Sequence, residues 1–123
     1  MRIPPLLLAA GMGSRSLTYF DFEKICDQEG ILVARHDIPC EGYYACVDGI
    51  PCIALNRRLK EPRLSVVAFH ELGHHYLHEP AFYRYGDPAS RKAEWQAQQF
   101  AVIALIPWKS ANREFWPPIF KLY

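Results

Sequence analysis

The chain has 123 residues, a length that suits one domain and leaves no room for a multidomain arrangement. Half of the residues are apolar and 22% are charged, which excludes a disordered chain and predicts a hydrophobic core. Lysine and arginine total 14 against 13 acidic residues, with no concentrated basic patch, so direct binding of nucleic acid is not expected.

The first elements expected along the chain are an irregular arm and a helix. Residues 1–15 contain two prolines and two glycines, which favour irregular backbone. A helix is predicted over residues 16–30, with Phe22, Ile25 and Cys26 as its apolar stripe and a glycine at its end.

Three short strands are predicted next. Residues 31–34 form a β-rich run directly after the first helix. Residues 43–47 and 50–55 flank the dipeptide Asp48-Gly49, which favours the two-residue turn of a hairpin. We therefore expect a small antiparallel sheet.

Two further helices are predicted in the C-terminal half. Pro62 can occupy the first turn of a helix that runs to about His78. Ser90 can cap a second helix over residues 91–106, which Pro107 ends.

These elements predict an α+β domain in which the small antiparallel sheet packs with about three helices. The domain is expected to span residues 16–107, between the arm over residues 1–15 and an aromatic, irregular tail over residues 108–123.

Four of the five histidines fall within nine residues of the predicted helix that follows Pro62; they are His70, His74, His75 and His78. At about 100° per residue, these histidines and Glu71 occupy one face of the helix, and apolar residues occupy the other. Gly73 costs about 1 kcal/mol relative to alanine in a helix interior, so it indicates close approach of another backbone. The alternative is a wet helix face that the histidines merely decorate.

The segment His70-Glu71-Leu72-Gly73-His74 is an H-E-x-x-H sequence, which places two imidazoles one helical turn apart with a carboxylate beside the first. Two such histidines suit zinc, which then needs a third protein ligand and an open position for hydrolysis. Glu71 is the expected general base, because it can take a proton from water and pass it to a leaving amine. Manganese or cobalt could occupy the same kind of site.

Glu94, on the last predicted helix, is the best-placed third ligand. Ala97 and Ala101 follow it along one stripe and would let this helix approach the H-E-x-x-H helix closely. The alternative is a solvated surface glutamate near a helix start. Weaker candidates for the third ligand are Glu79, Asp87 and Glu114.

Several further residues near the motif are considered for stabilising the transition state: His75, His78, Tyr83, Arg84 and Tyr85. Their alternative role is packing or surface solvation. We expect the active cleft to lie between the two C-terminal helices and the edge of the sheet, where a substrate peptide could add as an extended strand.

The motifs together resemble the ImmA/IrrE metallopeptidases over residues 17–107. The matching segments are Ile53-Ala54-Leu55-Asn56, Phe69-His70-Glu71-Leu72-Gly73-His74 with Leu77-His78, the pattern E-x-x-A-x-x-F-A that begins at Glu94, and Leu105-Ile106-Pro107. The resemblance implies a minimal zincin-like domain with His70, His74 and Glu94 as zinc ligands and Glu71 as the base. His78 matches a recurrent family position of unassigned role.

The resemblance also implies a substrate. Members of that family are implicated in cutting helix-turn-helix transcriptional repressors, so a protein partner of this kind is expected, with no membrane partner. The alternative is a metallopeptidase-like module that docks to a regulator or toxin without cutting it. Unlike some relatives, this chain is not expected to carry an appended helix-turn-helix module.

The four cysteines form no C-x-x-C pair, which argues against a zinc ribbon or a redox motif. We interpret them as reduced residues of a cytoplasmic protein. A secreted hydrolase with two disulfides is the remaining alternative, although the apolar run after Pro5 is a poor signal peptide.

Overall fold

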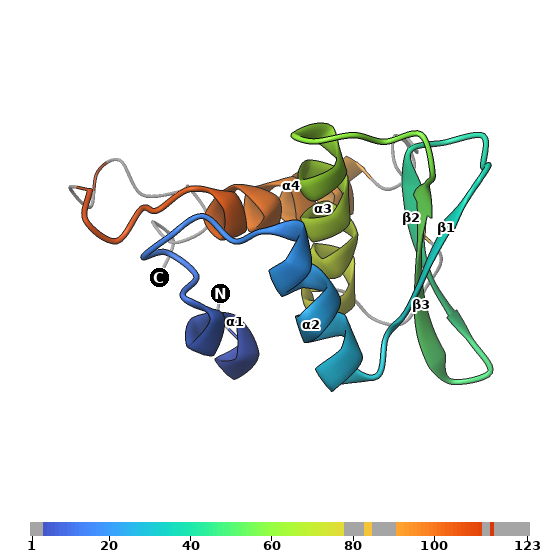
Figure 1. Ribbon diagram of the computed structural model, residues 1–123, viewed down its shortest axis with the longest axis horizontal. Helices are drawn as coiled ribbons and strands as arrows, with labels where there is room; N and C mark the ends of the chain where they lie inside the picture. Colours follow the sequence, from blue (N-terminus) through green and yellow to red (C-terminus); the bar gives the residue numbers. More distant parts are fainter. Residues whose placement is uncertain (1–3, 78–82, 85–90, 112–113, 115–123) are drawn as a thin grey trace.

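Four helices and a four-stranded sheet make up the described part of the chain, which comprises residues 4–77, 83–84, 91–111 and 114 of the computed structural model (Figure 1). In chain order, the elements are α1 (Pro5–Ala10), α2 (Tyr19–Glu29), β1 (Leu32–His36), β2 (Gly42–Val47), β3 (Ile50–Asn56), α3 (Arg63–Leu77), β4 (Tyr83–Arg84) and α4 (Arg91–Leu105). The predicted α+β class is confirmed.

Helix α2 is capped at both ends, by side chains at Thr18 and by the backbone at Gly30. The Thr18 hydroxyl accepts a hydrogen bond from the backbone N–H of Asp21, and the Asp21 carboxylate accepts one from the backbone N–H of Thr18. Gly30 ends the helix in the left-handed region, with φ of 73°. The predicted stripe of Phe22, Ile25 and Cys26 is buried.

The sheet has the strand order β1-β3-β2-β4. Asp48 and Gly49 both have positive φ, 52° and 80°, as a two-residue hairpin turn between β2 and β3 requires. The expected hairpin is therefore present, with Val47 opposite Ile50.

The prediction of an antiparallel sheet is wrong in one respect, because β1 pairs parallel with β3. Strand β3 lies between β1 and β2, so the two strands that follow one another in the sequence are not neighbours in the sheet. Strand β2 runs antiparallel to β3, and β1 runs in the direction opposite to β2. Strands β1 and β3 therefore run in the same direction, and they form a parallel pair because they lie side by side.

The helices lie on one side of the sheet in Figure 1, and α3 and α2 contact the strands. The side chains of Tyr44, Ile53 and Leu55 are at most 3% exposed. Helix α3 also packs against α2 and, most extensively, against α4. Phe22, Phe69 and Phe100, one from each of these helices, belong to one buried cluster.

Two segments expected to be irregular contain ordered structure. Residues 5–10 form helix α1, which has proline at its first position and Gly11 as a left-handed cap. Leu7 and Met12 are fully buried, so the segment contributes to the core. Trp108 is 5% exposed, and its indole N–H donates to the carbonyl of Ile103. The division into arm, domain and tail stays a prediction.

All four cysteines are free thiols, so the alternative with two disulfides has no support. Burial raises the pKa of Cys26 to about 12, which makes that thiol unreactive. Within the described ranges, every helix is too short or too polar to cross a bilayer.

Candidate metal centre

Helix α3 is buried on its apolar face and, around the H-E-x-x-H motif, on its polar face as well. Ala68, Phe69 and Leu72 lie in the core as expected. His70, Glu71 and His74 are also at most 2% exposed, because α4 packs over this part of the helix. A wet face decorated by histidines is therefore excluded for these three residues.

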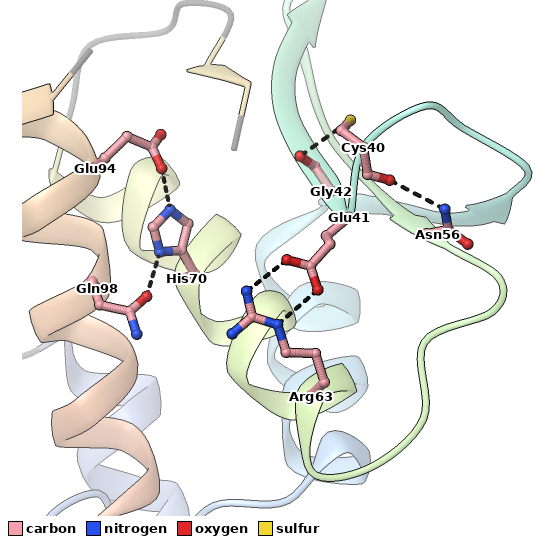
Figure 2. Close-up of polar contacts among 8 residues, drawn as sticks. All are labelled: Cys40, Glu41, Gly42, Asn56, Arg63, His70, Glu94 and Gln98. Atoms are coloured by element: carbon pink, nitrogen blue, oxygen red, sulfur yellow. Dashed lines mark hydrogen bonds and ion pairs between the residues drawn. The ribbon is translucent and has the colours of Figure 1, made fainter. Parts of the chain in front are cut away.

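Helix α4 brings Glu94 onto the two histidines of the motif. His70 Nε2 lies 2.7 Å from Oε2 of Glu94, and His74 Nε2 lies 2.9 Å from Oε1 of the same carboxylate. Ligand atoms of His70, His74 and Glu94 all lie within 4.8 Å of one another. The three residues predicted as metal ligands thus converge on one point, and Figure 2 shows Glu94 meeting His70 from α4.

The neighbouring histidines stabilise the ionised form of Glu94. Burial is the largest single influence and opposes ionisation, but hydrogen bonds from His70 and His74 outweigh it and lower the pKa of Glu94 to about 2. Glu94 is therefore a carboxylate at neutral pH and can serve as an anionic metal ligand.

Gly73 explains how α4 comes so close. A Cβ atom at residue 73 would lie 2.9 Å from the Cβ of Phe100 and 3.1 Å from the Cα of Ala97, inside normal contact distance. Ala97 and Ala101 are at most 1% exposed at the same interface. The predicted close approach of another backbone at Gly73 is confirmed, and small residues on both helices make it possible.

Replacing Gly73 with alanine is expected to destabilise the protein, although alanine is the better helix former. Overpacking costs about 1–3 kcal/mol and outweighs the gain of about 1 kcal/mol in helix propensity. Urea unfolding of the metal-free protein measures the net change. An increase in the free energy of unfolding would show that α4 shifts to accommodate the added methyl group without strain, and would contradict the tight packing.

Glu71 is fully buried, and neither of its carboxylate oxygens has a hydrogen-bond partner among the described residues. Burial, and behind it the charge of Glu94, raises the pKa of Glu71 well above that of an ordinary glutamate. A buried carboxylate without partners is costly, which indicates that a group held by the site normally satisfies it.

The residues present fit a divalent metal ion. Two imidazole nitrogens and one carboxylate are the donor set of catalytic zinc sites, and the unpartnered carboxylate of Glu71 lies next in sequence to one of those donors. The same donors accommodate manganese or cobalt, so this geometry specifies a divalent metal and does not select zinc among them.

The other residues considered for the site lie apart from the three ligands or outside the described ranges. His75 Nδ1 lies 3.0 Å from the hydroxyl of Tyr44 on β2, and His75 Nε2 lies 3.5 Å from the carboxylate of Glu29 on α2. These contacts tie α3 to the sheet and to α2. Glu114 is exposed. His78, Glu79, Tyr85 and Asp87 lie outside the described residues, as do the side chains of Tyr83 and Arg84.

One contact of the site was not foreseen from the sequence. His70 Nδ1 lies 2.9 Å from Oε1 of Gln98, one helical turn beyond Glu94 on α4. The spacing of four residues from Glu94 is a signal that could have identified it, because residues at this spacing share a helix face.

Comparison with known proteins identifies the family. The chain matches a family model, Peptidase_M78, described as the IrrE N-terminal-like domain, over residues 26–115. Searches among curated proteins and solved structures find no match. Because the family match covers well over half of its 123 residues, the chain belongs to the IrrE N-terminal-like domain family and contains a metallopeptidase-like domain.

Proposed function

We propose that the protein is a zinc-dependent endopeptidase that hydrolyses a peptide bond in a protein partner. The observation that carries the proposal is the convergence of His70, His74 and Glu94 on one point, with the buried carboxylate of Glu71 adjacent in sequence to His70. Membership of a peptidase family supports the same reaction class.

Each residue has a distinct role in this proposal. His70 and His74 would hold zinc through their imidazole nitrogens, and Glu94 would contribute the negative charge. Zinc, when bound, supplies a Lewis acid that polarises the scissile carbonyl and makes water more acidic. The carboxylate of Glu71 accepts a proton from the attacking water and returns it to the leaving amine.

The proposed substrate is a helix-turn-helix transcriptional repressor, by analogy with the ImmA/IrrE metallopeptidases. Such a partner places the reaction in the cytoplasm. Neither direct contact with nucleic acid nor a membrane surface is needed, because the repressor itself is what the enzyme recognises.

Strand addition is the proposed way for the substrate to bind, and the sheet limits where it can happen. Strand β4 pairs with Tyr43 and Tyr44, so one part of the β2 edge is already occupied. Residues 45–47 of β2 pair only with β3 among the described residues. A substrate strand would extend the sheet at residues 45–47 or displace β4.

The test is to incubate the zinc-loaded protein with helix-turn-helix repressors from the same organism and to analyse the products by mass spectrometry. Two fragments whose masses sum to the repressor plus one water are expected, and a chelator should prevent their formation. An intact repressor in a stable stoichiometric complex would overturn the peptidase proposal in favour of a binding module.

A further inference from the structure

The imidazole of His70 is held at both of its nitrogens by the same helix. Glu94 meets Nε2 at 2.7 Å, and Gln98 meets Nδ1 at 2.9 Å through its side-chain oxygen (Figure 2). Glu94 and Gln98 are one turn apart on α4 and point to opposite edges of the ring. The ring itself is 2% exposed, so water does not compete for either contact.

We propose that Gln98 is a positioning residue for the metal centre, and this rests on the proposed function. A histidine that binds metal through Nε2 carries its proton on Nδ1 and usually donates that proton to a neighbouring acceptor. The Gln98 oxygen is that acceptor. When metal replaces the Nε2–H···Glu94 contact, this acceptor keeps the proton on Nδ1, so that the Nε2 lone pair would be free for the metal, and it fixes the angle of the ring.

The position of Gln98 couples this contact to the metal. Because a helix places residues four apart on one face, the backbone of α4 that carries the ligand Glu94 also carries the group that orients His70. The tight contact of α4 with Gly73 holds that backbone against α3. One helix thus supplies both a ligand and the hydrogen bond that prepares a second ligand.

Three variants on α4 separate positioning from packing. Gln98→Leu removes the acceptor at similar size, and Gln98→Glu restores an acceptor. Gln99→Leu is the matched control, because the side-chain oxygen of Gln99 is buried with no hydrogen-bond partner among the described residues. Should Gln98→Leu fail to fold, the unbranched Gln98→Met carries the same test.

The primary measurement is zinc affinity by competition with a chelator of known affinity. Loss of the partner of a ligating histidine typically weakens metal binding by about 10- to 100-fold, which is the result expected for Gln98→Leu. Gln98→Glu should bind zinc at least as tightly as the wild type, and Gln99→Leu should match the wild type.

A second readout reports the ring itself. Long-range proton–nitrogen NMR spectra of the zinc-loaded wild type should show His70 protonated at Nδ1. The visible spectrum of the cobalt-substituted protein should change in Gln98→Leu and be restored in Gln98→Glu. A loss of packing alone would move neither signature.

The outcomes distinguish the two proposals. Wild-type zinc affinity and an unchanged cobalt spectrum in Gln98→Leu would overturn the role of Gln98 while leaving the metal centre intact. Absence of zinc binding by the wild type would overturn the metal centre and the role of Gln98 with it.

Discussion

Replacing Glu71 with glutamine is expected to abolish peptide-bond hydrolysis while zinc remains bound. Glutamine matches the size of glutamate but cannot accept a proton at neutral pH, so the attacking water loses its base. General-base catalysis contributes about 100- to 10,000-fold, and the rate of repressor cleavage should fall by at least that factor. Cleavage rate and zinc content are measured on the same preparations.

The same substitution should leave the metal-free fold unharmed. Both carboxylate oxygens of Glu71 are buried without partners, and burial makes their charge costly. A neutral amide avoids that cost, so the free energy of unfolding of metal-free Glu71→Gln should equal or exceed that of the wild type. Cleavage at the wild-type rate by a fully folded Glu71→Gln protein would refute the assignment of the base.

Replacing Glu94 with alanine is expected to eliminate stable zinc binding. The change removes one of three ligands, and it also leaves His70 Nε2 and His74 Nε2 without the carboxylate that both now contact. Elemental analysis of protein purified without added metal should find about one zinc per wild-type chain and much less in Glu94→Ala.

The metal-free fold should also suffer from the loss of Glu94. Removing the partner of a buried polar group typically costs about 1–3 kcal/mol, and two imidazoles lose theirs here. The free energy of unfolding, measured in urea with a chelator present, should fall accordingly.

Glu114→Ala is the matched control for zinc content, because Glu114 is exposed and was the rival ligand in the tail. It should retain zinc at the wild-type level. Full zinc content in Glu94→Ala, or loss of zinc in Glu114→Ala, would show that the third ligand has been assigned to the wrong residue.

The features predicted correctly from the sequence are those with local causes. His70 and His74 share a helix face because four residues make about one turn. Asp48-Gly49 forms a hairpin turn because both residues tolerate positive φ. Gly73 indicated a close neighbour because glycine is otherwise unfavourable inside a helix.

The features that the sequence did not reveal depend on which distant segments meet. Strand periodicity shows that β1 exists but not that β3 rather than β2 lies beside it. The apolar run in residues 5–10 was obscured by two prolines, yet one of them begins helix α1. Gln98 belongs to no motif; its spacing from Glu94 places it on the same face of α4, but only the tertiary structure shows that it contacts His70.

The sequence by itself determined which candidate groups this protein carries: two imidazoles and a glutamate on one helix, and a second glutamate with small neighbours on another. Local spacing is enough for that, because helix geometry is the same in every protein. Only the tertiary structure decided that α4 packs against α3 at Gly73, which brings Glu94 onto both histidines, places Gln98 against His70 and buries Glu71. Those outcomes depend on packing between segments far apart in the chain, which no local pattern encodes.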